Sequence, residues 1–345
     1  MNSLGIYFGT FAPCHVGHFE QIVRAKREND RAVVIVSGYD GDRGDLAGMS
    51  LNNRVKAMRE LLKDDPTVSV RMLDETNIPK YPAGWAPWLN LLRERVEETF
   101  DISDVNRMTF YVGETEYMEP LDSYFKAHWA QSEIVITRVD RRVTGISGTS
   151  IRENPLYNWD FVTRPFRRFF VKNVLIIGGA GTGKTALTRD LARRYSTSYS
   201  LEYLPDFLRE RLVEEQELDI KDFHEIGIGQ YEHNRYHIHS PGTRKVFFAD
   251  TDVMMTKLFA QSHLDEEDFN QLVPVFDFYI SLQTWALIIV LPPTEEDSSY
   301  ERILDELSRQ QLTHSVVTLE GLNYQEIYEA AHQLVDALLA DGRDN

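Results

Sequence analysis

The sequence predicts an α/β protein with two doubly wound parallel sheets, one in each half of the chain. The chain has 345 residues, which is enough for about two domains of ~150 residues each. Apolar residues make up 42% and charged residues 26% of the sequence, which is typical of globular proteins and excludes collagen-like and disordered classes. Short apolar segments alternate with segments of helical period in both halves, and this alternation indicates parallel β–α–β units.

The first half begins with an expected strand at residues 4–9, followed by a glycine-containing turn and a helix. Phe19, Ile22 and Val23 follow the apolar period of that helix. Four further strands, each separated from the next by a helical segment, are expected at residues 32–37, 68–72, 108–113 and 134–138.

The second half repeats this pattern from an expected strand at residues 174–179. A second glycine-rich turn follows, and then a helix with Leu187, Leu191 and Tyr195 at helical spacing. Further strands are expected at residues 198–201, 245–249, 278–282 and 315–319.

The two halves are predicted to be separate domains, residues 1–153 and 172–345, joined by a connector at residues 154–171. Asn154-Pro155 and Arg164-Pro165 interrupt the helical period inside the connector. The connector is also aromatic and basic, so we expect it to be packed against a domain and not to be a flexible linker.

Charge and cysteine content limit the partners of the chain. Its formal net charge is -17 at pH 7, which repels nucleic acid and anionic membranes at long range, so neither is an expected partner. Cys14 is the single cysteine, which excludes an intrachain disulfide and a cysteine-based zinc site. No basic leader or apolar run of ~20 residues is present, so a cytoplasmic protein is expected. A homo-oligomer is compatible with the sequence.

The glycine-rich turn of the second half matches the pattern G-x-x-x-x-G-K-[S/T] between a strand and a helix. Backbone N–H groups in such a turn converge on a phosphate. Lys184 is expected to reach the β- and γ-phosphates of ATP, and the hydroxyl of Thr185 to bind Mg²⁺. The alternative is a glycine turn that only enters a helix. The remaining residues expected to bind ATP here are Gly178, Gly179, Ala180, Gly181, Thr182 and Gly183.

Three carboxylates follow predicted strands of the second half. Asp250 and Asp252 come after an apolar strand; we expect Asp250 on the magnesium side and Asp252 as a substrate-binding or supporting residue. Two solvated loop aspartates are the alternative. Glu202 follows the strand at residues 198–201, where it is placed to accept a proton from a substrate hydroxyl, unless it is a plain surface glutamate.

The turn after the first strand, residues 9–18, carries two histidines. His15 and His18 are three residues apart at a helix start, so one helix face is expected to present both imidazoles. Imidazole donors there would stabilise charge on a phosphoryl oxygen of ATP. A metal pair or two buried structural donors are the alternatives. The ATP-binding residues expected in this turn are Gly9, Thr10, Phe11 and Gly17.

A second candidate grip on a triphosphate lies at residues 145–152. Ser147 and Thr149 are expected to bind ATP at a helix start, and Arg152 follows one turn into the helix. Serine and threonine caps are common, so this signal gains weight only together with the histidine turn. Arg54 and Arg59 could also face phosphate, although a solvated helix face is the simpler interpretation.

Together these motifs resemble known enzymes. The first turn is similar to nucleotidyltransferases with an (H/T)xGH motif, and residues 146–152 match their ISxTxxR element. The second half resembles a P-loop small-molecule kinase. The order and lengths of the two halves resemble the bifunctional nicotinamide-nucleotide adenylyltransferase/ribosylnicotinamide kinase family, as do residues 81–88 and 250–252.

The resemblance implies two ATP-dependent reactions. The kinase half would phosphorylate nicotinamide riboside, and the transferase half would join the nicotinamide mononucleotide to AMP, giving NAD and pyrophosphate. His15, His18 and Arg152 would serve adenylyl transfer. The residues implied for phosphoryl transfer are Lys184, Thr185, Asp250 and Glu202. Of these, Thr185 and Asp250 would bind Mg²⁺. Trp85 and Trp88 could stack a nicotinamide ring or pack in the core.

Two departures from the family are expected. Some members carry an N-terminal helix-turn-helix repressor module, which we expect this chain to lack. The family also has a lid over ATP, with a tryptophan, acidic residues and an arginine after a late strand. Here Trp285 precedes an apolar segment, residues 286–291, then residues 292–297, and the next arginine is Arg302, so the lid is expected to be irregular.

Two other functions remain open. One is an adenylyltransferase for a different phosphate acceptor, because the histidine turn specifies ATP better than its acceptor. The other is an adenylyltransferase for NAD synthesis whose P-loop half senses nucleotide and is weakly active or inactive.

Overall fold

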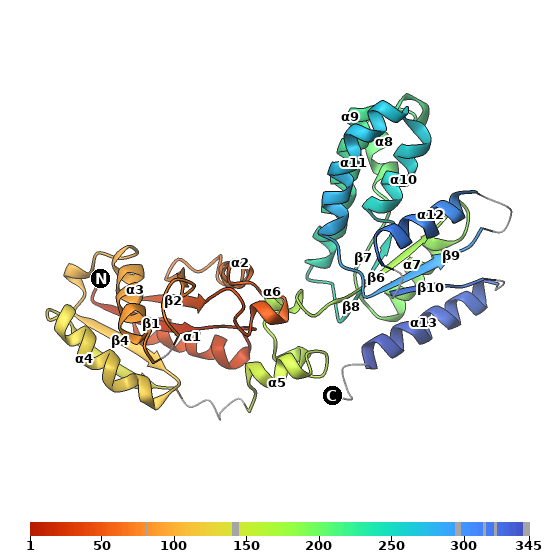
Figure 1. Ribbon diagram of the computed structural model, residues 1–345. Helices are drawn as coiled ribbons and strands as arrows, with labels where there is room; N and C mark the ends of the chain where they lie inside the picture. Colours follow the sequence, from red (N-terminus) through yellow and green to blue (C-terminus); the bar gives the residue numbers. More distant parts are fainter. Residues whose placement is uncertain (81, 140–144, 294–297, 313–314, 321–322, 341–345) are drawn as a thin grey trace. The chain divides into compact units, whose positions relative to one another are not determined.

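The computed structural model of the chain divides into two compact units after Phe169 (Figure 1). Each unit has its own sheet and its own hydrophobic core. The structure describes all residues except 81, 140–144, 294–297, 313–314, 321–322 and 341–345.

The first unit contains a five-stranded sheet in the order β3-β2-β1-β4-β5, and every neighbouring pair is parallel. The chain builds outward from β1 to β3 on one side and then returns to place β4 on the other side of β1. The carboxyl ends of β1 and β4 therefore form a topological switch point, where ligands of such sheets bind. The strands are β1 (Ser3–Gly9), β2 (Arg31–Gly38), β3 (Val68–Asp74), β4 (Arg107–Val112) and β5 (Glu133–Arg138).

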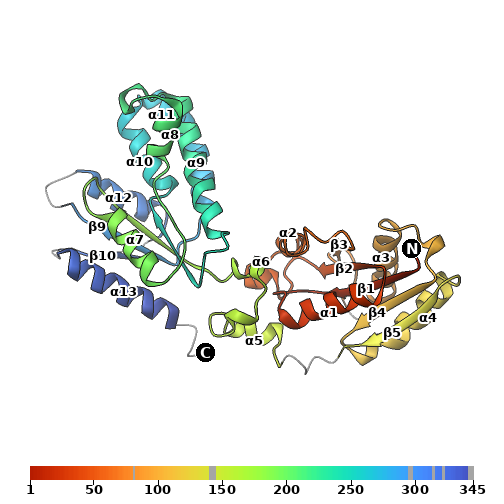
Figure 2. The same cartoon turned by 180° about the vertical axis from the view of Figure 1, so that it is seen from behind.

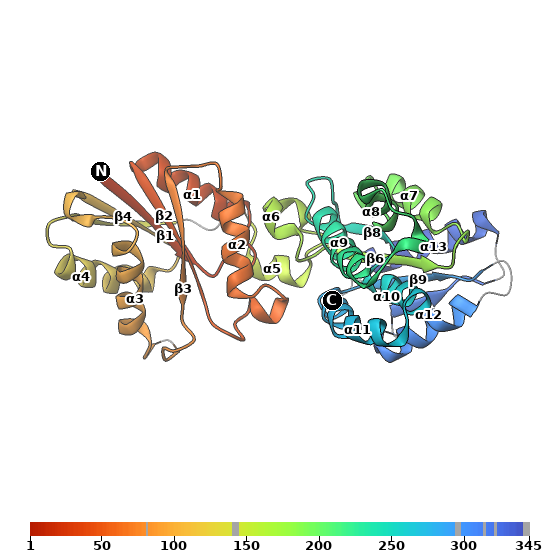
Figure 3. The same cartoon turned by 90° about the horizontal axis from the view of Figure 1, so that it is seen from above.

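Helices cover both faces of this sheet. α1 and α2 pack on one face, and α3 and α4 bury their apolar sides against the other (Figure 3). The inner strands β1, β2 and β4 are largely buried and mostly apolar, whereas the edge strands β3 and β5 are mostly half-buried and carry polar residues. The α-helices are α1 (Val16–Glu28), α2 (Leu51–Leu61), α3 (Trp85–Glu97), α4 (Met118–His128), α5 (Gly148–Glu153) and α6 (Arg164–Arg167).

The second unit contains a five-stranded sheet in the order β10-β9-β6-β8-β7, again with parallel pairs throughout. β6 lies at its centre, and the switch point lies between β6 and its neighbours β8 and β9. The strands are β6 (Lys172–Gly178), β7 (Tyr199–Ser200), β8 (Val246–Asp250), β9 (Leu287–Leu291) and β10 (Val316–Thr318).

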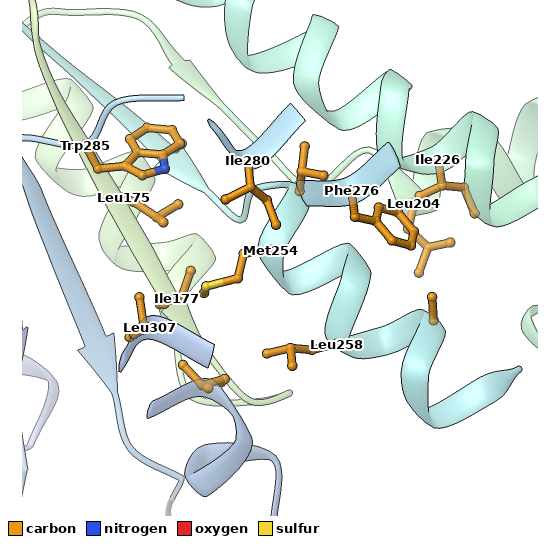
Figure 4. Close-up of a cluster of buried hydrophobic side chains, with 14 of the residues drawn as sticks. Leu175, Ile177, Leu204, Ile226, Met254, Leu258, Phe276, Ile280, Trp285 and Leu307 are labelled. Carbon is orange, nitrogen blue, oxygen red and sulfur yellow. The ribbon is translucent and has the colours of Figure 1, made fainter. Parts of the chain in front are cut away.

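Two cores flank the second sheet. One lies under α7 and α13, and the larger one lies between the sheet and the helices α8 to α12 (Figure 4). α8, α9, α10 and α11 lie side by side (Figures 1 and 2). None of the helices described is long and apolar enough to cross a membrane. The helices are α7 (Lys184–Arg194), α8 (Leu204–Arg211), α9 (Ile220–Ile238), α10 (Val253–His263), α11 (Glu266–Ser281), α12 (Ser298–Arg309) and α13 (Tyr324–Ala340).

The predicted fold class, two doubly wound parallel sheets, is confirmed, but the strand predicted at residues 278–282 is wrong. That segment is the last turn and C-cap of α11, which is capped at its start by Asp265 and buries Leu272, Phe276 and Ile280 at helical spacing. The strand next to β6 is β9 instead. β9 is buried on both faces, so it is an unbroken apolar run with no alternation to mark it as a strand.

This correction changes the interpretation of the lid. Trp285 comes before β9 and is buried in the core. The segment that follows the strand therefore begins at Pro292, and residues 294–297 of the expected lid lie outside the described part of the chain.

Candidate functional site

A cavity of about 1250 Å³ opens at the carboxyl ends of the strands in the first unit. Gly9 ends β1, Ser37 lies one residue before the end of β2, and Gly113 follows β4; all three line the cavity. Its lining also includes all the residues predicted for the site in the first half of the chain, namely Gly9, Thr10, Phe11, His15, Gly17, His18, Trp85, Trp88, Ser147, Thr149 and Arg152.

The two histidines of the first turn stack on each other at the start of α1. His15 is the N-cap of the helix, and its Nδ1 accepts a hydrogen bond from the backbone N–H of Gly17 at 3.2 Å. A neutral His15 therefore carries its proton on Nε2 and presents a donor. The ring centroids of His15 and His18 lie 3.8 Å apart, and the edge of Phe11 packs on His18. The part of the chain that the structure describes holds no group of three or more His, Cys, Asp or Glu side chains that could hold a metal ion.

Arg152 connects the second predicted ATP-binding segment, residues 145–152, to the histidine turn. Its guanidinium donates to the backbone carbonyl of Ala12 at 2.6 Å and to Thr149 Oγ1 at 3.0 Å. Ser147 is the N-cap of α5, and its hydroxyl accepts from the backbone N–H of Ser150 at 3.1 Å. Partial burial, and then the nearby Arg43, lower the pKa of Arg152. Two neighbouring cations in one cavity favour a ligand that carries several negative charges.

Arg54 contradicts the interpretation of a solvated helix face. It is 0% exposed, and it donates to the carbonyl of Thr10 at 2.8 Å and to Asp42 Oδ2 at 2.7 Å. Gly38 makes room for it, because a Cβ there would lie 2.6 Å from Arg54 Nη2. Arg54 therefore supports the histidine turn through the carbonyl of Thr10, whereas Arg59 is exposed.

Arg43 is a cavity residue that the sequence did not reveal. Its Nη2 donates to Thr10 Oγ1 at 2.9 Å, and its side chain lines the cavity. It lies in a loop without periodicity, between two glycines, so no spacing rule singled it out. Its backbone is held by the buried ion pair of Asp42 and Arg54 next to it.

The two tryptophans form a stacked pair, with ring centroids 5.3 Å apart and planes 7° apart. Trp88 is 8% exposed and belongs to the core, but both rings line the cavity. The indole N–H of Trp88 donates to Glu75 Oε1 at 3.2 Å, and burial raises the pKa of Glu75. Glu75 also lines the cavity and was not predicted, because a single acidic residue after a strand carries no motif. Tyr81 lies outside the described residues.

The segment expected to be a connector supports the histidine turn. The hydroxyl of Thr163 donates to the carbonyl of Cys14 at 2.9 Å, and Val162 forms a β-bridge with His15. Cys14 is fully buried, and burial raises the pKa of its thiol to about 12. The thiol is therefore neutral and acts as a small packing group.

The glycine-rich turn of the second unit joins β6 to α7. Gly181 and Gly183 have φ angles of 75° and 88°, a region that glycine adopts without steric cost. Thr182 Oγ1 and Lys184 Nζ both donate to the carbonyl of Gly179, at 3.0 and 3.4 Å. The predicted residues from Gly178 to Thr185 thus surround the N-terminus of α7, where backbone N–H groups favour an anion.

Thr185 and Asp250 lie side by side at the ends of neighbouring elements. The Thr185 hydroxyl donates to Asp250 Oδ2 at 2.5 Å. The other oxygen, Oδ1, is buried and has no hydrogen-bond partner among the described residues. Burial raises the pKa of Asp250, whereas the nearby Lys184 lowers it. A hydroxyl and a carboxylate with one unsatisfied oxygen fit the few protein ligands that Mg²⁺ uses when substrate phosphates complete its shell.

Asp252 and Glu202 complete the group of carboxylates. Asp252 caps α10 through the backbone N–H of Met255, and its Oδ2 accepts from the indole N–H of Trp285 at 3.1 Å. Both oxygens are therefore engaged by the protein, which favours the supporting interpretation of this residue. Burial raises the pKa of Glu202, with opposing effects of the charges of Lys184 and Asp250, so Glu202 lies in the same electrostatic environment as the glycine-rich turn.

Family models match both halves of the chain. A cytidylyltransferase-like model matches residues 6–154, and an AAA domain model matches residues 173–334. The trifunctional NAD biosynthesis/regulator protein NadR of Salmonella typhimurium is 28% identical over 278 residues, which cover 77% of this chain and 64% of that protein. The chain thus spans less than two thirds of the length of this curated relative.

Solved structures match the chain more completely. A NadR protein in complex with NR is 35% identical, with a TM-score of 0.88 over 99% of this chain and 97% of the other. A NadR protein in complex with NAD and AMP-PNP is 36% identical, with a TM-score of 0.85 over 96% of each chain. Because this similarity extends over nearly the whole length of both chains at 35% and 36% identity, the chain belongs to the NadR family.

Proposed function

We propose that the protein is a bifunctional enzyme of NAD biosynthesis. One unit phosphorylates nicotinamide riboside, and the other adenylylates the resulting mononucleotide. The observation that carries this proposal is that one chain has two separate clusters suited to ATP phosphates. They are the stacked histidines with Arg152, and the turn with Lys184, Thr185 and Asp250. The ligands of the related NadR structures, NR, NAD and AMP-PNP, support the same assignment.

In the first unit, a phosphate oxygen of the mononucleotide attacks the α-phosphorus of ATP. The bond from that phosphorus to the bridging oxygen of pyrophosphate breaks, and NAD and pyrophosphate leave. His15, His18 and Arg152 align the two phosphates and neutralise the charge that builds up between them. The stacked Trp85 and Trp88 offer an aromatic face to the cationic nicotinamide ring, a contact worth ~0.5–2 kcal/mol.

In the second unit, the riboside hydroxyl attacks the γ-phosphorus of ATP, and ADP leaves. Lys184 contacts the β- and γ-phosphates. Thr185 and Asp250 would hold Mg²⁺, which would neutralise phosphate charge. Glu202 accepts the hydroxyl proton; burial raises the pKa of its carboxyl group, which makes it a better base.

A P-loop half that binds nucleotide without turnover is the second candidate. It rests on the irregular lid expected after Trp285. Trp285 precedes β9, and residues 294–297 of the expected lid lie outside the described part of the chain, so the assay below decides between the two candidates. The cytoplasmic location stays a prediction.

The test is an assay of purified protein with ATP and one of the two acceptors at a time. With ATP and nicotinamide mononucleotide we expect NAD and pyrophosphate; with ATP and nicotinamide riboside we expect mononucleotide and ADP, and chelation of Mg²⁺ should abolish phosphorylation. Absence of NAD, with turnover of another phosphate monoester, would overturn the transferase assignment. Tight ATP binding without riboside phosphorylation would favour the nucleotide-sensing alternative.

A further inference from the structure

Helix α9 carries two buried amide side chains that no motif explains. Gln230 and Asn234 are each 1% exposed, and their spacing of four places them on one helix face. Buried amides destabilise a fold unless their polar groups are hydrogen-bonded. The groups that they bind therefore indicate what these side chains do.

Gln230 binds the backbone on both sides of Glu202. Its Oε1 accepts from the N–H of Tyr203 at 2.7 Å, and its Nε2 donates to the carbonyl of Leu201 at 3.3 Å. One amide thus holds the peptide groups that flank the proposed proton acceptor.

Asn234 binds the turn that carries the aspartates. Its Nδ2 donates to the carbonyl of Thr251 at 3.1 Å, and its Oδ1 accepts from Ser200 Oγ at 2.6 Å and from Gln230 Nε2 at 3.0 Å. Thr251 follows Asp250 directly and has a φ of 88°. A residue other than glycine keeps such a conformation only where its surroundings hold it there.

The pairing of β7 with β8 ends before the functional residues begin. The two strands are in register only through Tyr199 with Phe248 and Ser200 with Ala249. Beyond these pairs the ladder no longer sets the separation of Glu202 from Asp250. Beyond that point side chains of α9 connect the two strand ends, because Gln230 binds the chain after β7 and Asn234 binds the chain after β8.

We propose that Ser200, Gln230 and Asn234 form an amide clamp that fixes the position of Glu202 relative to Asp250 for phosphoryl transfer. The inference rests on the proposed kinase function. The three side chains are positioning residues: their hydrogen bonds go to one another and to the backbone around the two carboxylates.

The test variant is Gln230→Met, which keeps the volume but removes both bonds around Glu202. Because misplacing a catalytic group by about 1 Å can cost ~100-fold in rate, we expect riboside phosphorylation to lose about 50-fold or more in kcat. KM for ATP should stay within about twofold, because the glycine-rich turn is not part of the clamp. Adenylyl transfer, measured on the same sample, should be unchanged.

Gln310→Met is the matched control. Gln310 lies in the same unit and donates to Glu306 and Asp277, so the variant loses similar bonds away from the clamp. We expect its phosphorylation kcat to stay within about threefold of wild type. Equal losses in the two variants, or a wild-type kcat in Gln230→Met, would overturn the clamp.

Ser200→Ala decides the matter if Gln230→Met does not fold. It removes only the hydroxyl that donates to Asn234 Oδ1, so the fold should persist while the clamp loses one of its hydrogen bonds. A lower kcat with an unchanged KM for ATP supports the clamp, and a wild-type kcat overturns it. If wild-type protein forms no mononucleotide from riboside, the kinase proposal fails and the clamp fails with it. If wild-type protein is active and the variants are equally active, the clamp alone fails.

Discussion

Asp252 shows what a single buried carboxylate does to this protein. It is 2% exposed, and burial raises its pKa to about 6. The hydrogen bonds from Met255 and Trp285 offset part of the desolvation penalty but do not abolish it. The folded chain therefore holds a proton on Asp252 at pH values where the unfolded chain has released it.

We expect the stability of wild-type protein relative to Asp252→Asn to fall as pH rises from about 4 to 7. The folded state binds the extra proton in this range, so each rise in pH favours the unfolded state, and the asparagine does not titrate. The change should total about 3 kcal/mol, from a pKa that rises from 3.8 to about 6. Denaturant unfolding of both proteins across this pH range measures it. A pH-independent difference would contradict the raised pKa.

Residues that act through a motif could be predicted from the sequence, whereas those that act through the tertiary fold could not. The spacing of two turns singled out His15, His18 and Lys184, and the structure places the two histidines together in the cavity and Lys184 in the glycine-rich turn. Arg43 and Gln230 reach their sites through loop and helix packing. Nothing in their local sequence distinguishes them from surface residues, because the partners are far away in the chain.

At the scale of elements, strands and helices were predictable where periodicity and turns agreed. The five strands of the first unit lie within a few residues of their expected positions. The error at residues 278–282 arose because aromatic and β-branched residues at a helix end look like a strand. The apolar run of β9 lacks alternation, and only its pairing with β6 and β10 identifies it as a strand.

A buried ion pair anchors α12, the helix that follows the lid segment. Lys257 on α10 is 3% exposed and Glu306 on α12 is 2% exposed. Their Nζ and Oε1 atoms lie 2.7 Å apart, and Asp277 on α11 is also 2.7 Å from Lys257 Nζ. Three helices of the second unit thus meet at one ammonium group.

Lys257→Met should destabilise the second unit by about 3 kcal/mol, because it leaves the Glu306 carboxylate buried without its main partner. The double variant Lys257→Met with Glu306→Leu should recover most of this loss, since neither charge is then left unpaired. The free energy of unfolding by denaturant is the measurement. If Lys257→Met alone is as stable as wild type, the ion pair does not anchor α12.

At the scale of the whole molecule, the acidic chain places three cations where phosphates would bind. The formal net charge is -17, yet Arg43 and Arg152 lie next to each other in the first unit and Lys184 lies in the glycine-rich turn of the second. Each unit also has its own sheet and its own core. The cavity of the first unit is lined by residues of that unit, and the glycine-rich turn of the second unit is held by hydrogen bonds within that unit.

This independence predicts that the two activities can be removed separately and then restored by mixing. Lys184→Ala should lower riboside phosphorylation by about 100-fold or more and leave NAD formation from mononucleotide intact; His18→Ala should do the reverse. Neither variant alone should convert riboside to NAD at the wild-type rate. A mixture should do so after a lag, because mononucleotide released by one chain can bind another, and chromatographic analysis of NAD over time would show it. If each variant keeps its own activity but the mixture forms no NAD, the intermediate does not pass between chains.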